Sequence, residues 1–135
     1  MPILGLFKKK TPKKSRRSYL IAQIDAIMSK RIRGRDGNRC RRCGRERVFA
    51  HHIFTKTRLS TRFVPENLIS LCFHCHRWAH SAGEEFREWI LSWMNKGEYD
   101  QLYLWSQTRG GFKEIDLKLM LWDIRRTNDR DICGD

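Results

Sequence analysis

Apolar side chains recur at helical spacing near the start of the chain. After Ser18 the apolar positions are Leu20, Ile21, Ile24, Ile27 and Met28, which lie on one face of a helix. Ser18 is a favourable N-cap residue, and Gly34 and Gly37 interrupt the pattern. We therefore predict a helix over residues 18–34.

Residues 83–127 show the same periodicity. The apolar positions there are Phe86, Trp89, Ile90, Trp93, Met94, Tyr99, Leu102, Tyr103, Trp105, Leu117, Met120, Leu121 and Ile124. Such aromatic residues could form base-stacking platforms, but at helical spacing they are more typical of a core. We predict C-terminal helices that pack around the centre of the chain.

Two short segments in the centre indicate strands. They are residues 48–54 (VFAHHIF) and 67–71 (NLISL), and a helix is expected to begin near Cys75. Neighbouring side chains of a strand point to opposite faces. His51 and His52 are therefore not expected to share one role.

The positive charge is unevenly distributed. The chain carries 28 Lys and Arg against 15 Asp and Glu, a net charge of +13. Residues 1–17 hold seven basic and no acidic side chains, and residues 30–63 hold twelve basic and two acidic ones. Residues 81–135 hold eight basic and eleven acidic side chains. Basic segments bind phosphates and release their counterions, so nucleic acid is the expected partner. A solvated basic surface that aids solubility is the alternative.

Residues 1–17 are expected to form a flexible basic tail. They have little to bury and repel one another, and they also suit a nuclear-localisation signal. The expected phosphate-binding side chains are Lys8, Lys9, Lys10, Lys13, Lys14, Arg16 and Arg17. The apolar start precedes this basic cluster, the reverse of a secretory signal, and no apolar run is long enough to span a bilayer. A secreted or membrane protein is therefore not expected.

Four of the five cysteines form two Cys-x-x-Cys pairs. These are Cys40 with Cys43 and, after 28 residues, Cys72 with Cys75. Two such pairs complete the tetrahedral sulfur coordination that Zn²⁺ prefers. Disulfides and unrelated pairs are the alternatives, but no secretory signal supports disulfides. We predict a structural zinc site without an open coordination position, with Cys133 left over.

Histidines follow the second pair. His76 and His80 are four residues apart, so they lie on one face of the predicted helix and could chelate one ion. His74 lies between two predicted zinc ligands and is expected at the exposed surface rather than on the metal.

Together these motifs resemble the HNH endonucleases. The resemblance is carried by residues 35–44 (RDGNRCRRCG), 51–53 (HHI) and 67–76 (NLISLCFHCH). It implies an α+β fold with a small ββα-metal, treble-clef-like core at residues 35–82, held together by the four-cysteine zinc site and flanked by N- and C-terminal helices. One nuclease domain over residues 18–135 is expected, most similar to the small bacteriophage members.

The resemblance also implies roles for the site residues. His52 matches the general base, His51 and His76 match ligands of a catalytic cation, and His80 matches an additional ligand. Asn67 matches the asparagine that fixes the loop carrying the base. Many members have aspartate in place of His51, and a site of imidazoles alone is softer. The catalytic ion is therefore left open among Mn²⁺, Mg²⁺, Ni²⁺, Co²⁺ and Zn²⁺.

The expected function is hydrolysis of phosphodiester bonds in double-stranded DNA. Lys56, Arg58 and Arg62 lie in the expected loop between the strands and could contact the DNA. The resemblance to phage members adds the DNA-packaging machinery as a possible partner and the cytoplasm of a bacterial host as the location. A non-catalytic zinc-dependent DNA-binding module is the main alternative, and a cysteine-based redox protein is a remote one.

Overall fold

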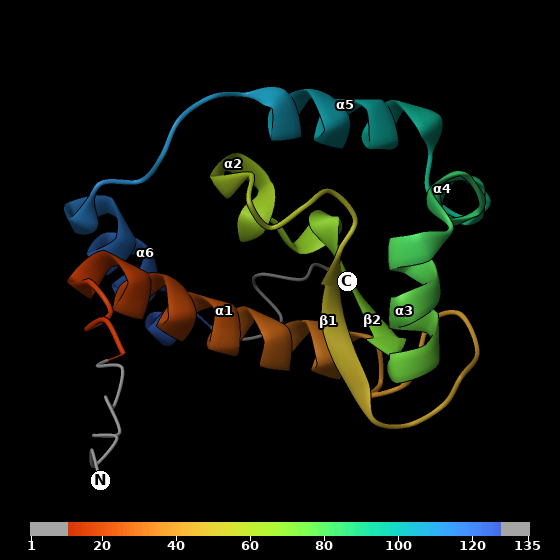
Figure 1. The fold of residues 1–135 in the computed structure, drawn as a ribbon, viewed down its shortest axis with the longest axis horizontal. Coiled ribbons are helices and arrows are strands. Elements are labelled where there is room, and N and C mark those ends of the chain that lie inside the picture. The colour runs from red at the N-terminus through yellow and green to blue at the C-terminus, as the bar shows by residue number, and fades with distance from the viewer. Residues whose placement is uncertain (1–10, 128–135) are drawn as a thin grey trace, which may run out of the picture.

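The computed structural model describes residues 11–127, so Lys8, Lys9, Lys10 and Cys133 lie outside the described residues. The elements are α1 (Arg16–Arg35), β1 (Val48–His52), α2 (Leu59–Arg62), a 3-10 turn η1 (Pro65–Asn67), β2 (Leu68–Cys72), α3 (Phe73–Ser81), α4 (Gly83–Leu91), α5 (Lys96–Gln107) and α6 (Glu114–Arg126) (Figure 1). The α+β class and the central order of strand, strand and helix are confirmed. Among the described helices, none is long and apolar enough to cross a membrane.

Helix α1 begins earlier than predicted. Its N-cap is Ser15, whose hydroxyl accepts a hydrogen bond from the Ser18 N–H at 3.2 Å, so the prediction that Ser18 caps the helix is wrong. Arg16 and Arg17 therefore belong to the first turn of α1 and not to the tail. Arg16 forms an ion pair with Glu114 of α6 at 3.2 Å. This ion pair joins the first turn of α1 to α6, and the sequence around Arg16 does not indicate it.

The two strands form an antiparallel pair whose register runs from Val48 opposite Cys72 to His52 opposite Leu68. All five residues of β2 are buried. Strand β1 ends at His52, two residues earlier than predicted, and β2 keeps the predicted length but is shifted by one residue, from Leu68 to Cys72. Figure 1 places the pair between α1 on one side and α3 on the other.

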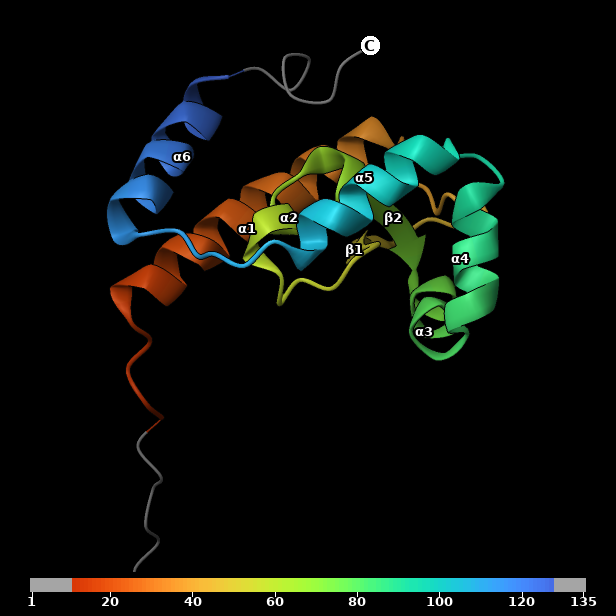
Figure 2. The same ribbon diagram turned by 90° about the horizontal axis from the view of Figure 1, so that it is seen from above.

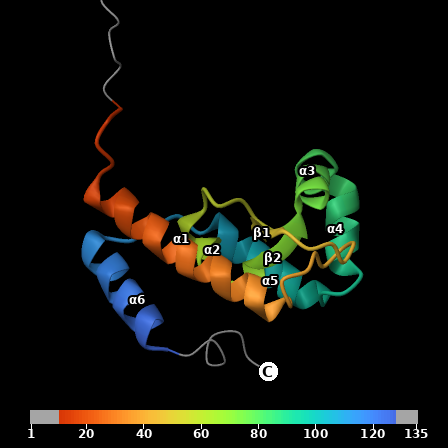
Figure 3. The ribbon, with the colours of Figure 1, turned by 90° about the horizontal axis from the view of Figure 1, so that it is seen from below.

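Two apolar cores meet at β2. The larger one joins the sheet to α3, α4 and α5, and its main members are Val48, Ile69, Leu71, Ala79, Phe86, Ile90, Met94 and Leu102. The smaller one joins α1 to α6, which lies along it (Figures 2 and 3), and contains Leu20, Ile24, Met28, Ile32, Phe63, Leu68, Leu117 and Leu121. The helical stripes predicted for α1 and α6 are thus the faces that pack together.

Part of the aromatic core prediction is wrong. Phe86 is buried, but Trp93, Tyr103 and Trp105 are 37%, 49% and 49% exposed. Trp93 is covered from outside by the Arg41 guanidinium, 4.2 Å from the ring centroid. An indole ring can serve as a platform for a cation at the surface, so helical periodicity overestimated how far these rings are buried.

The end of α1 is tied to β2 by an ion pair. Asp36, whose side chain is 4% exposed, pairs with Arg35 at 2.9 Å and accepts a hydrogen bond from the Ser70 N–H at 2.9 Å. Arg35 also donates to the carbonyls of Leu68 and Pro65, at 2.6 and 2.9 Å. These bonds fix the position of β2 relative to α1.

We predict that Asp36→Ala lowers the free energy of unfolding by about 3 kcal/mol, because it leaves the Arg35 charge and the buried Ser70 N–H without their partner. Urea unfolding of the metal-loaded protein measures this change. Glu46→Ala is the matched control: its ion pair with Arg39 is exposed and should contribute less than about 1 kcal/mol. Equal effects of the two substitutions would contradict the prediction.

Candidate active site

Two turns bring four cysteines together. Cys40 and Cys43 follow α1, Cys72 ends β2, and Cys75 lies in the first turn of α3. Their sulfur atoms all lie within 4.8 Å of one another. Tetrahedral zinc with bonds of about 2.3 Å needs sulfur atoms about 3.8 Å apart, so the arrangement fits such an ion. The predicted four-cysteine cluster is confirmed as a set of side chains able to hold a structural metal such as zinc.

Local backbone geometry forms both turns. In the first, Gly44 has a φ of +78° and donates to the Cys40 carbonyl at 2.8 Å, a conformation that glycine adopts without strain. In the second, the Cys72 sulfur accepts a hydrogen bond from the Cys75 N–H at 3.5 Å and thereby caps α3. His74, between these two cysteines, is exposed as expected and lies outside the sulfur cluster.

One arginine between the first two cysteines contacts the second pair. Arg42 places its guanidinium 3.7 Å from the centroid of Trp78 and donates to the Cys75 sulfur at 3.6 Å. A cation at this distance stabilises the negative charge of a metal-bound thiolate. The sequence Cys-Arg-Arg-Cys therefore supplies two sulfur atoms that could bind a metal and a cation beside the cluster.

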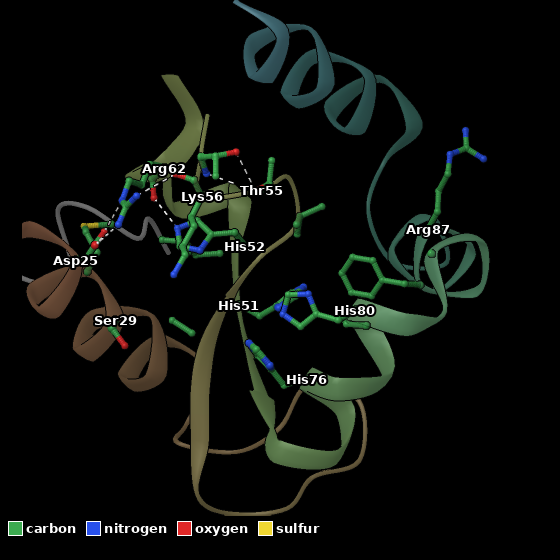
Figure 4. A pocket seen from close by; sticks show the side chains of 18 of the residues that line it. Asp25, Ser29, His51, His52, Thr55, Lys56, Arg62, His76, His80 and Arg87 are labelled. Carbon is green, nitrogen blue, oxygen red and sulfur yellow. Dashed lines mark hydrogen bonds and ion pairs between the residues drawn. The ribbon is translucent and has the colours of Figure 1, made fainter. Parts of the chain in front are cut away.

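A second cluster consists of three imidazoles. His51 comes from β1, and His76 and His80 come from one face of α3 (Figure 4). Their ring centroids are 4.7 to 5.0 Å apart, and one nitrogen of each lies within 4.8 Å of the others. The three residues predicted to hold the catalytic ion are thus brought together, and the donor set fits a divalent metal that accepts nitrogen ligands.

Two of these imidazoles, His51 and His76, are held in the neutral form that a metal requires. Burial, with the neighbouring His76, His80 and His52, lowers the pKa of His51 to about 3. Burial also lowers the pKa of His76, with further contributions from His80 and Lys56. At neutral pH both rings therefore keep a free lone pair.

His52 points away from the imidazole cluster, as the alternation of a strand predicts (Figure 4). Its Nε2 lies 3.0 Å from the carbonyl oxygen of Arg62. A carbonyl can only accept, so Nε2 carries the proton and Nδ1 keeps the lone pair. Burial lowers the pKa of His52, although the Arg62 carbonyl and Asp25 act in the opposite direction.

Asn67 is fully buried and ties together both ends of the segment after β1. Its side-chain carbonyl accepts from the Phe54 N–H at 2.8 Å, and its NH₂ group donates to the Phe54 and Thr61 carbonyls at 3.1 and 3.0 Å. The carbonyl that binds His52 belongs to the residue after Thr61. Asn67 thus stabilises the backbone that orients His52.

His51, His52, His76 and His80 line one cleft with a volume of about 720 Å³. Among the described residues, its lining includes the basic Lys56, Arg62 and Arg87 and, as its one carboxylate, Asp25. Glu66, close to the site in sequence, instead lines a separate groove beside α5. Within residues 11–127 the imidazole cluster therefore has no carboxylate ligand, and the cleft suits an anionic ligand.

The residues predicted to contact DNA lie in different environments. The expected loop contains a short helix, α2, and Arg62 at its end pairs with Asp25 of α1. Lys56 lines the cleft, whereas Arg58 precedes α2 and is exposed outside it. Lys13 and Lys14 are exposed in the segment before α1.

Arg87 is a cleft residue that the sequence did not single out. It is exposed on α4, lines the cleft and lies 5.5 Å from the ring centroid of Tyr99. The signal that could have identified it is its position as the one basic residue of α4, among three glutamates. It adds a positive charge to the cleft beside those of Lys56 and Arg62.

Comparison with known families gives one match: residues 40–82 match the family model described as HNH endonuclease. This region holds the four cysteines of the metal cluster, both strands and α3. No match was found among curated proteins or among solved structures.

We predict that Cys40→Ser or Cys75→Ser removes one equivalent of bound zinc and lowers the melting temperature, because binding of a structural metal is coupled to folding. Elemental analysis and thermal unfolding measure both effects. Cys133→Ser is the matched control, since it leaves all four sulfur ligands in place and should keep the zinc. A Cys40→Ser protein with unchanged zinc content and melting temperature would rule out this role.

Proposed function

With residues 40–82 as an HNH endonuclease region, we propose that this protein is a metal-dependent endonuclease that hydrolyses phosphodiester bonds of double-stranded DNA. One observation carries the proposal. Two neighbouring residues of β1 face opposite ways within the same cleft, His51 toward the imidazole cluster and His52 toward a backbone carbonyl. Metal-dependent hydrolysis uses both a cation and a base, and this arrangement places the two on adjacent residues that face opposite ways.

His51, His76 and His80 are the proposed ligands of the catalytic cation. A bound divalent ion would supply Lewis-acid stabilisation of charge on the phosphate and on the departing 3′ oxygen. With imidazoles and no carboxylate among the described residues, the donor set favours Mn²⁺, Ni²⁺, Co²⁺ or Zn²⁺ over Mg²⁺. The four-cysteine cluster is the proposed site of a structural Zn²⁺, since four thiolates fill its coordination.

His52 is the proposed general base. Its Nδ1 lone pair accepts a proton from the attacking water, whose oxygen forms a bond to phosphorus as the bond to the 3′ oxygen breaks. The hydrogen bond from Nε2 to the Arg62 carbonyl keeps the ring in the tautomer that this step needs. It also stabilises the imidazolium that results, because that N–H then carries more positive charge.

The remaining residues at the cleft bind DNA phosphates or orient His52 in this proposal. Asn67 holds the backbone beside His52, while Lys56 and Arg87 are the proposed contacts to DNA phosphates near the cation cluster. Contacts to phosphates give affinity without sequence information. Arg58, the lysines before α1 and the arginines in its first turn are further proposed contacts to DNA phosphates.

A non-catalytic zinc-dependent DNA-binding module would use the same cysteines and the same basic charge. Such a module would have no use for the cluster of three imidazoles at His51, His76 and His80. It would also have no use for the buried Asn67, which holds the loop beside His52. The redox alternative has no support, because all four cysteines of the two pairs lie in one cluster. A single nuclease domain over residues 18–135, a phage origin, a packaging partner and a bacterial cytoplasmic location stay predictions.

We predict that His52→Ala lowers the rate of plasmid nicking by about 10²- to 10⁴-fold, the usual contribution of a positioned base. DNA affinity and binding of the cation at the imidazole cluster should change little, because none of their contacts is removed. The measurement is single-turnover nicking of supercoiled plasmid, with and without EDTA. Wild-type cleavage by purified His52→Ala protein would exclude His52 as the base.

His51→Ala and His76→Ala provide the matched comparison. Each removes a proposed cation ligand, so activity should fall and then recover in part as the metal concentration is raised. His52→Ala should show no such recovery. The three variants should all retain the zinc of the four-cysteine cluster, and identical metal dependence in all three would contradict the separate roles.

The N-terminal segment gives a test of its own. Deleting residues 1–14 keeps the Ser15 cap of α1 and removes five lysines. We predict weaker binding to all DNA sequences by a similar factor. The slope of log affinity against log salt should shrink by at most about 0.9 for each phosphate that the shortened protein no longer binds. An unchanged slope would show that these lysines do not contact the phosphates.

A further inference from the structure

The Arg62 side chain joins three separate parts of the chain. Its Nε and Nη2 bind the two carboxylate oxygens of Asp25, at 3.0 and 2.5 Å, and its Nη1 donates to the Lys56 carbonyl at 3.0 Å. The side chains of Arg62 and Asp25 are only 19% and 32% exposed. A bidentate arginine–carboxylate pair of this kind fixes orientation as well as distance.

The backbone of the same residue holds the proposed base. The Arg62 carbonyl accepts the Nε2–H of His52, and on its other side the Thr61 carbonyl accepts from Asn67. Asn67, immediately before β2, holds the Thr61 carbonyl of this pair. From the other side, Arg62 is held by Asp25 of α1 (Figure 4). His52 is thus oriented from two directions, one of which lies outside the matched family region.

Building on the proposed nuclease function, we infer that Asp25 and Arg62 are positioning residues, which hold the Arg62 carbonyl where it selects the tautomer and orientation of His52. Helix α1 then influences the orientation of His52 through the ion pair between Asp25 and Arg62. In this assignment Arg62 is a positioning residue rather than a DNA contact, because each of its three nitrogens already donates to Asp25 or to the Lys56 carbonyl.

The hydrogen bond to Lys56 adds a second consequence. Lys56 lines the cleft, and its charge contributes to the low pKa of His76. By binding the Lys56 carbonyl, the Arg62 side chain also fixes the backbone of Lys56. An Arg62 variant would therefore disturb both His52 and Lys56, whereas an Asp25 variant leaves the bond from Arg62 to the Lys56 carbonyl in place.

The test is a comparison of Asp25→Asn in two backgrounds. In the wild-type background, single-turnover nicking at saturating protein should fall about ten-fold, a part of the contribution of a positioned base. In the His52→Ala background, the same substitution should change the residual rate by less than about two-fold, because the base that the pair orients is already gone. Asp25→Glu, which keeps the carboxylate, should recover most of the activity. Asp100→Asn is the matched control, because it removes an exposed ion pair with Lys96 outside the cleft lining and should leave nicking unchanged.

A structural readout separates this inference from the proposed function. Long-range ¹H–¹⁵N NMR of the metal-loaded, folded protein should report His52 with its proton on Nε2, and Asp25→Asn should shift part of the population to Nδ1–H. Arg62→Gln should give the same shift, and it is the second variant if Asp25→Asn does not fold. This measurement needs no cleavage activity.

Two results would overturn the inference. An unchanged rate and an unchanged tautomer in both variants would do so while leaving the nuclease intact. An equal loss of rate with and without His52 would also do so, since the pair would then act elsewhere. If wild-type protein cleaves no DNA, the proposed function fails, and the NMR result alone decides whether the pair orients His52.

Discussion

Convergence of four cysteine sulfurs on one point is the constraint on which the rest of the structure depends. Cys72 ends β2, contributes to the cluster and caps α3, so strand, metal-binding turn and helix share one residue. The partner turn at Cys40 immediately follows the Arg35–Asp36 ion pair that binds α1 to β2. A sheet of two five-residue strands is too small to be stable by itself. The position of the sheet is therefore fixed by the hydrogen bonds from Arg35 and Asp36 and by the cysteine cluster, which a bound metal ion would hold together.

The predictable features were those encoded over short distances. The Cys-x-x-Cys pairs, the spacing of His76 and His80 and the opposite orientation of His51 and His52 follow from local geometry, and the structure has all three. The apolar faces of α1 and α6 were predictable for the same reason. The resemblance to a known family added roles to the histidines that local geometry had already singled out, and it alone pointed to Asn67.

Features that depend on distant contacts were missed. Asp25 and Arg62 are 37 positions apart, and nothing near either residue indicates that they pair. Ser15 rather than Ser18 caps α1, and the first turn that follows contacts α6 through the ion pair between Arg16 and Glu114. Trp93 is partly exposed and contacts the Arg41 guanidinium. In each case an arginine interacts with a group far away in sequence. A chain with 28 basic residues offers too many such pairings for sequence reasoning to choose among them.

The pairing of Val48 with Cys72 has a consequence for how the chain can vary. A shift of β1 by one residue would turn every side chain of the strand to the opposite face, so that His51 and His52 would exchange places. Seven residues separate Cys43 from His51, and the metal-binding turn fixes where that segment begins. A one-residue insertion or deletion that shifted this register would therefore exchange the positions of His51 and His52. The pairing beside the cysteine cluster thus determines which histidine faces the other imidazoles, a role distinct from holding the fold together.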